Sequence, residues 1–193
     1  MTLIALIAAL VLISASVVPT SIAWAQTPPS YAGDQSRALK ALSTKDIDDL
    51  VQGRGMGLAK AAELNRYPGP MHALDLSEPL KLSREQQDLL KAIMGRMSGE
   101  AKSLGAALLG LERELDAAFA ARTIESRSLK ERMEQIGVKQ GALRAVHLAA
   151  HLETAAALSA EQIARYDALR GYSDLGATPV QEPGHGGGGR ARH

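Results

Sequence analysis

The chain has 193 residues, no cysteine, a formal net charge of +1 and only 3% aromatic residues. This length favours a single domain with a core of aliphatic side chains. The lack of cysteine excludes disulfides, thiolate metal sites and cysteine nucleophiles. Acidic and basic residues are interleaved, which excludes a broad basic surface, so no nucleic-acid partner is expected.

The first residues have the pattern of an export signal. Residues 3–18 are almost wholly apolar, and Ala23-Trp24-Ala25 has the small-x-small form that a signal peptidase cuts. We therefore predict a signal peptide over residues 1–25, cleaved after Ala25, and a periplasmic protein. No Lys or Arg precedes the apolar run, so an uncleaved membrane anchor is the alternative, although a run of about 16 residues is short for a span.

The segment after the cleavage site predicts a leader and then a first short helix. Residues 26–42 contain the proline and glycine of a flexible leader. Ser43 can cap a helix that begins at the next residue. Gly53, Gly55 and Gly57 then indicate a bend. They do not form a phosphate-binding loop, because no strand precedes them and no Lys-Ser or Lys-Thr follows.

Two further short helices are expected before the long ones. A helical pattern resumes over residues 58–64 and again over residues 71–76. Between them stands Tyr67-Pro68-Gly69-Pro70, whose prolines restrict the preceding residues and end the first of the two helices. The N-terminal third of the domain is thus predicted to be a set of short helices packed on something longer.

One phrase occurs twice, each time at the start of an expected helix. The two copies are Leu82-Ser83-Arg84-Glu85-Gln86 and Leu158-Ser159-Ala160-Glu161-Gln162. In each copy the serine hydroxyl can accept from the glutamine amide while the glutamine side chain returns to the serine amide, which is a capping box. The leading leucine is placed for a hydrophobic staple. We expect helices to begin directly after Ser83 and Ser159.

Between the two phrases the sequence predicts a long antiparallel helical hairpin, and hence an all-α fold with short flanking helices. Apolar residues recur at alternating steps of four and three. The first helix carries Leu90, Met94, Met97, Ala101, Leu104, Leu108, Leu111, Leu115 and Ala118, and the second carries Leu129, Met133, Ile136, Leu143, Val146 and Ala150. The chain reverses near residues 122–124, where Thr123 or Ser126 can cap the return helix. Gly105 then comes opposite Gly141, which predicts close backbone approach.

His147 and His151 form the sharpest chemical feature. At i and i+4 they share one helix face, so both imidazoles can reach one ion. The fold-back also sets Gly99 and Gly95 level with them, which leaves room beside the two rings. No cofactor is required, but nickel, copper, cobalt or zinc would suit this donor set. The candidate metal ligands are His147, His151, Glu153 and His72.

The paired L-S-x-E-Q phrases, with an export signal, a helical pattern and no cysteine, resemble the L-T-x-x-Q motifs of the Spy/CpxP family over roughly residues 46–172. Ser83 and Ser159 replace the usual threonine and keep the capping hydroxyl. The resemblance implies a bent four-helix hairpin that dimerises into a cradle. It implies an ATP-independent envelope-stress chaperone that binds unfolded or misfolded client proteins. Relatives that sense or buffer metal imply the alternative, a periplasmic metal-binding protein.

For a client-binding surface the candidate residues are Met56, Met71, Arg96 and Arg113. Methionine suits adaptable contact, but a methionine on the hairpin seam is more often core. Met56 and Met71 lie off the seam and are expected to be exposed. A thin hairpin leaves apolar area uncovered, so a homodimer is expected. A dedicated partner such as a sensor kinase is a further alternative. No enzyme is expected, because no Ser/His/Asp set or carboxylate pair emerges.

The C-terminal segment, residues 173–193, is predicted to be a disordered tail. It is rich in glycine and contains His185 and His193. Such a composition cannot build a core. The tail either binds ions loosely through these histidines or serves only as a soluble end.

Overall fold

A computed structural model of the protein describes residues 31–172. The chain divides into two compact units, Met1–Gln35 and Ser36–His193. A short 3-10 turn, η1 (Asp34–Ser36), stands at the boundary, and α1 to α6 all belong to the second unit. The predicted signal peptide, its cleavage site, the membrane-anchor alternative and the tail over 173–193 lie outside the described residues.

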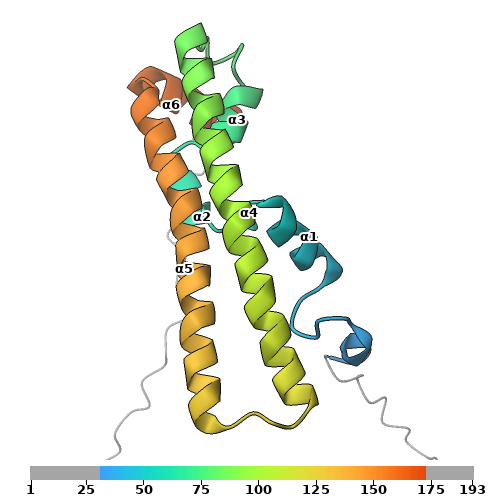
Figure 1. Ribbon diagram of the computed structural model, residues 1–193. Helices are drawn as coiled ribbons and strands as arrows, with labels where there is room; N and C mark the ends of the chain where they lie inside the picture. The colour runs from blue at the N-terminus through green and yellow to red at the C-terminus, as the bar shows by residue number, and fades with distance from the viewer. Residues whose placement is uncertain (1–30, 173–193) are drawn as a thin grey trace, which may run out of the picture. The chain divides into compact units, whose positions relative to one another are not determined.

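The described part of the chain contains helices and no strand, which confirms the predicted all-α class. The helices are α1 (Thr44–Gln52), α2 (Lys60–Glu63), α3 (Pro70–Asp75), α4 (Arg84–Ala120), α5 (Ser126–Ala157) and α6 (Ala160–Leu169). α4 and α5 run antiparallel along most of their length and form the predicted hairpin (Figure 1). Over residues 31–172, none of these helices combines the length and the apolar character that crossing a membrane requires.

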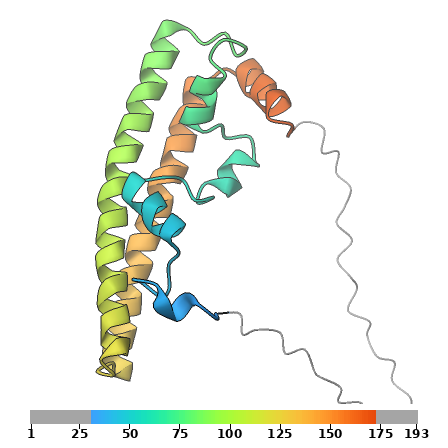
Figure 2. The same cartoon turned by 90° about the vertical axis from the view of Figure 1, so that its right-hand side faces the viewer.

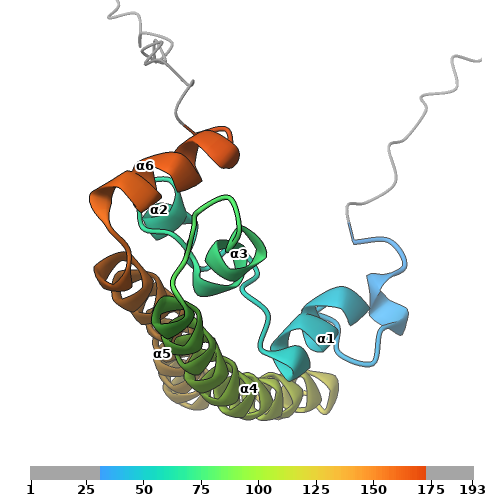
Figure 3. The ribbon, with the colours of Figure 1, turned by 90° about the horizontal axis from the view of Figure 1, so that it is seen from above.

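Within the second unit, α4 and α5 form one layer and the short helices pack on one side of it. Seen along the hairpin, α1, α2, α3 and α6 all lie on the same side of the two long helices (Figures 2 and 3). No other helix within residues 36–172 covers the opposite side of the layer. These short helices occur before α4 and after α5 in the chain.

The buried side chains form two clusters along the hairpin. One cluster joins the short helices to the end of the hairpin where α4 begins, and it contains Ala73, Leu80, Leu82, Leu90, Ile93, Ala150, Leu158 and Tyr166. The other lies nearer the turn and contains Leu39, Leu50, Ala101, Leu108, Leu109, Ile136 and Leu143. Leu82 and Leu158, the first residues of the repeated phrases, are both in the first cluster, as expected for staple residues.

Both repeated phrases form the predicted capping boxes, and the structure joins them to each other. The Ser83 hydroxyl accepts from the Gln86 amide at 3.1 Å, and the Gln86 Oε1 accepts from the Ser83 amide at 3.0 Å. Ser159 and Gln162 repeat this geometry at 3.1 and 2.9 Å. The two glutamine carboxamides then hydrogen-bond reciprocally, at 2.9 Å and 3.0 Å between Nε2 and Oε1 atoms. One short motif therefore starts two helices and ties their starts together.

Each glutamine amide makes one more bond, to a backbone carbonyl of the other segment. Gln86 Nε2 donates to the Ala157 carbonyl at 2.9 Å, and Gln162 Nε2 donates to the Leu80 carbonyl at 3.3 Å. The Ala157 carbonyl belongs to the last turn of α5, where carbonyls lack helical partners. The two glutamines thus join the start of α4 to the end of α5, at the end of the hairpin opposite the turn.

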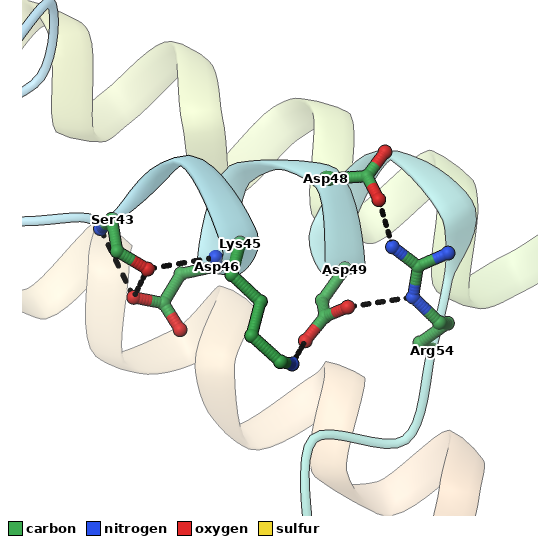
Figure 4. A network of polar contacts seen from close by, with 6 residues as sticks. All are labelled: Ser43, Lys45, Asp46, Asp48, Asp49 and Arg54. Atoms are coloured by element: carbon green, nitrogen blue, oxygen red, sulfur yellow. Dashed lines mark hydrogen bonds and ion pairs between the residues drawn. The ribbon is translucent and has the colours of Figure 1, made fainter.

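Polar side chains fix α1 at both of its ends (Figure 4). Ser43 and Asp46 form a capping box, which confirms the predicted start and lowers the pKa of Asp46 through its hydrogen bonds with Ser43. At the other end Arg54 donates from Nε to Asp49 Oδ1 at 2.6 Å and also pairs with Asp48. Gly53 ends the helix with φ of 63°, in the left-handed region that favours glycine.

The prediction that Gly105 of α4 comes close to Gly141 of α5 was wrong. A Cβ atom added at Gly105 would lie 2.2 Å from the Leu50 carbonyl oxygen of α1, whereas one added at Gly141 would meet nothing within 4 Å. The close approach is therefore between α4 and α1, not between α4 and α5. A pattern on two long helices could not identify this contact, because the third helix lies more than 50 residues away in the sequence.

Two boundaries and the exposure of one side chain also differ from the predictions. Glu125, not Thr123 or Ser126, is the N-cap residue of α5, and the Ser128 hydroxyl accepts from the Glu125 amide at 3.2 Å. Leu39 is buried, so packing begins inside the segment predicted as a leader over residues 26–42. Met133, predicted on the seam, is 42% exposed, whereas Ile136, also predicted there, is buried.

We predict that Gln86→Ala lowers the free energy of unfolding by about 1–3 kcal/mol, because it removes a cap and a partly buried amide pair. Gln162→Ala should act similarly. The double substitution should cost less than the sum of the two, since both remove one shared interaction. Urea unfolding measures all three, with Gln140→Ala on the exposed side of α5 as the control. If the effects of the two single substitutions add up to that of the double substitution, the two glutamines do not act as one interaction.

Candidate functional site

A large pocket opens between the short helices and the hairpin, at the level between the two core clusters. Its volume is about 740 Å³, within the usual range of ligand sites. Its apolar side chains include Met71, Met94 and Met97 from α3 and α4. We call this cavity the methionine pocket. Along α4, Met94 and Met97 follow Ile93, the last buried α4 residue of one cluster, and precede Ala101, the first buried α4 residue of the other.

The glycines of α4 shape one wall of this pocket. Gly95 and Gly99 line it together with His147 and His151, as the predicted fold-back required. A Cβ atom added at either glycine would meet nothing within 4 Å, so the missing side chains leave open space beside the imidazoles. The prediction of room next to these two rings is confirmed.

The four candidate client-binding residues do not gather at one place. Met71 is 52% exposed and lines the methionine pocket, while Met56 is 41% exposed and borders a neighbouring one, so both are exposed as predicted. Arg96 and Arg113 are exposed but line neither pocket. Arg96 is paired instead, with its Nη2 at 2.5 Å from Glu153 Oε2 across the hairpin.

The two histidines of α5 have different environments. His147 is 3% exposed, and its Nε2 has no hydrogen-bond partner. His151 donates from Nδ1 to the Tyr67 carbonyl at 2.7 Å, and the same atom lies 3.6 Å from Glu63 Oε2. A neutral His151 with its proton on Nδ1 keeps the Nε2 lone pair free. Both histidines therefore present an imidazole nitrogen that can accept a proton or bind an ion.

The predicted metal ligands are only partly brought together. His72 lines the methionine pocket with His147 and His151, but its Nδ1 lies 3.8 Å from Asp75. Glu153 is held by Arg96 and is not among the lining residues. Within residues 31–172 no group of three or more His, Asp or Glu side chains converges closely enough to hold a metal ion.

Sequence reasoning missed a carboxylate at the centre of a polar cluster. Glu63 Oε1 accepts from the Tyr166 hydroxyl at 2.5 Å and from the Tyr172 hydroxyl at 3.2 Å, and it lies 3.5 Å from Arg170 Nε. Burial is the main cause that raises the pKa of Tyr166, and its bond with Glu63 adds to the effect. No local pattern could identify this cluster, because its members are about one hundred residues apart.

Two further pockets continue from the methionine pocket past α2. The connecting pocket, of about 420 Å³, shares Ala59, His72 and His151 with the methionine pocket. The acidic pocket, of about 400 Å³, shares Glu63 and Tyr172 with the connecting pocket and adds Arg66 and Asp167. The three cavities therefore border one another in a row, with methionines lining the first and carboxylates lining the last.

Unpartnered polar atoms concentrate along this path. In the described part of the chain, the buried side-chain nitrogen and oxygen atoms that lack a hydrogen-bond partner are Glu63 Oε2, His147 Nε2 and Asp167 Oδ1. Each belongs to a residue that lines one of the three pockets. Buried polar atoms are almost always hydrogen-bonded, so we expect a water molecule, an ion or a ligand to supply the missing bond at each of these three atoms.

In comparisons with known proteins, no family model, no curated sequence and no solved structure matches this chain significantly.

We predict that His147 makes stability fall as the pH drops below neutrality. Burial, followed by the nearby charge of His151, lowers the pKa of His147 from the ordinary value of 6.5. As the pH falls, the unfolded chain therefore binds a proton at this histidine before the folded chain does. The stabilisation is complete above about pH 6.5 and is lost as the pH falls through the lowered pKa. Urea unfolding from about pH 7.5 to about pH 5 measures this decline.

His147→Leu should flatten that decline, because it removes the titrating ring. It should leave the free energy of unfolding at about pH 7.5 equal or higher, since the unpartnered Nε2 is removed with the ring. Arg144→Leu, on the exposed side of the same helix, serves as the control and should keep the decline. A slope unaffected by His147→Leu would show that another group causes it.

Proposed function

We propose that this protein is an exported, ATP-independent chaperone that binds unfolded or misfolded envelope proteins through the methionine pocket. The observation that carries the proposal is the pocket itself, a cavity of about 740 Å³ with methionines from two helices. The periplasmic location, the kinship with the Spy/CpxP family and the pairing of two chains into a cradle belong to the same proposal. They rest on the signal-like N-terminus and the two capping phrases.

The chemistry of the pocket suits a client of variable sequence. Methionine side chains are unbranched and polarizable, so they adapt to different apolar groups. Met71 is about half exposed, and Met94 is partly buried beside it. At the rim Lys102 is exposed and supplies a charge. Such a surface favours weak and changeable contacts, which let a client fold while it is held.

The test is suppression of client aggregation by the chain that begins at Gln26. We expect suppression at about stoichiometric amounts. Met71→Ser with Met94→Ser should raise the amount of protein required by about tenfold, because two apolar contacts are removed from the pocket. Light scattering of a chemically denatured client measures the effect.

Met133→Ser is the matched control for that substitution, because Met133 is exposed but does not line the pocket. It should leave the suppression unchanged. If the unaltered protein fails to suppress aggregation, the chaperone proposal is wrong. If both variants lose activity equally, the binding surface lies elsewhere on the protein.

A second candidate function, binding of a transition metal ion, is favoured by one observation. The buried Nε2 of His147 lacks a hydrogen-bond partner, while the Nδ1 bond of His151 leaves its own Nε2 free. A hydrogen bond from the second ring nitrogen is how metal-binding histidines are commonly oriented. The ion would be nickel, copper, cobalt or zinc, all of which accept imidazole.

Calorimetric titration with each of these four metal ions tests the second candidate. Binding by the unaltered protein should be abolished by His147→Ala with His151→Ala. The control variant carries His185→Ala with His193→Ala in the C-terminal tail and should keep the binding. Binding that survives loss of the α5 pair and disappears in the tail variant would assign the ion to the tail.

A further inference from the structure

The methionines of the described chain are concentrated at one place. Met71 of α3 and Met94 and Met97 of α4 line the methionine pocket, and Met56 lines the connecting pocket beside it. Within residues 31–172, Met133 of α5 is the methionine that borders neither of these two cavities. A reaction of methionine sulfur would therefore act mainly on the proposed binding surface.

Methionine is also the only source of sulfur that this chain offers to an oxidant, because the sequence contains no cysteine. A methionine thioether accepts one oxygen atom and becomes a sulfoxide, and specific reductases reverse the reaction. The change turns a flexible apolar side chain into a polar one. A methionine that binds an occupant by apolar contact therefore loses that contact when it is oxidised.

Access of an oxidant differs among the methionines of the pocket. Met71 is 52% exposed, whereas Met94 and Met97 are partly buried. Met71 belongs to neither buried cluster, while Met97 packs against the cluster that contains Ile93. An oxidant therefore reaches Met71 before the two methionines of α4, and a sulfoxide at Met71 leaves the core intact.

We propose that Met71 is a reversible oxidation site that weakens client binding when the protein meets hydrogen peroxide or hypochlorous acid. The sulfur lone pair attacks one peroxide oxygen, the O–O bond breaks, and the sulfoxide forms with release of water. With hypochlorous acid the products are the sulfoxide, chloride and a proton. A reductase that supplies two thiols returns the thioether and forms a disulfide and water. This inference rests on the proposed chaperone function and adds its regulation.

Met133 provides an internal control for this site. Its exposure of 42% is similar to that of Met71, but it lies outside both pockets. Both residues should be oxidised, whereas only the sulfoxide at Met71 should change binding. Accessibility thus decides where oxidation occurs, and position in the pocket decides what oxidation does.

The test treats the chain that begins at Gln26 with limiting hydrogen peroxide and then removes the oxidant with catalase. Peptide mass spectrometry measures the gain of one oxygen atom at each methionine. We expect Met71 and Met133 to be oxidised several times faster than Met94 and Met97, because their side chains are more exposed.

Fluorescence anisotropy with a labelled apolar peptide that contains no methionine then measures binding before and after treatment. The dissociation constant should rise about threefold on oxidation, because one apolar contact is lost. Methionine sulfoxide reductase with dithiothreitol should restore the original value.

Substitution by leucine, which has a similar volume and forms no sulfoxide, identifies the residue responsible. Each variant is compared with itself before and after treatment. Met71→Leu should abolish the rise in the dissociation constant, and Met133→Leu should keep the rise in full. Circular dichroism should show the same helix content before and after oxidation.

The possible outcomes separate this inference from the proposed function. If the unaltered protein binds the peptide and suppresses aggregation equally well after Met71 is oxidised, the inference is wrong and the chaperone proposal stands. A rise that survives in Met71→Leu, or a loss of helix on oxidation, would also overturn the inference, because the effect would come from another methionine or from unfolding. A protein that neither binds the peptide nor suppresses aggregation before treatment would overturn the proposed function, and the oxidation switch with it.

Discussion

The reciprocal carboxamide pair of Gln86 and Gln162 is the interaction on which the arrangement of this domain depends. Each carboxamide accepts from a helix N-cap amide, donates to the other carboxamide and donates to a backbone carbonyl of the other segment. The hairpin is joined at one end by its turn and at the other by this pair. The starts of α4 and α6 are therefore held next to each other by two side chains. The same side chains also donate to the backbone carbonyls of Ala157 and Leu80.

The position of α6 follows from that constraint, and the pockets follow from α6. Because Gln162 fixes the first turn of this helix, Tyr166 reaches the buried cluster at the open end of the hairpin. Its hydroxyl donates to Glu63, which links α2 to α6. Glu63 in turn lies beside His151. A short series of polar contacts thus connects the repeated motif to the cavity that we propose as the binding site.

The pockets combine two kinds of surface that serve binding. The methionine pocket offers apolar side chains that adapt to an occupant. The histidine and carboxylate groups along the same path offer polar atoms that the protein itself leaves without partners. Burial of unpartnered polar atoms opposes folding, so their concentration at cavities is consistent with a role in holding something that completes them. This combination supports the proposed chaperone function.

The sequence by itself determined the long helices and the starts of α1, α4 and α6, because these depend on groups three or four residues apart. Serine and glutamine at fixed spacing predicted both capping boxes, and the apolar repeat predicted the hairpin and the room beside His147 and His151. Only the tertiary structure decided which groups meet across 70 or more residues of chain, such as Gln86 with Gln162 and Glu63 with Tyr166. Long-range partners leave no periodic signal in a sequence, since each is selected by how helices pack and not by local spacing. For the same reason Gly105 was assigned to the wrong neighbour, and the acidic pocket was not predicted.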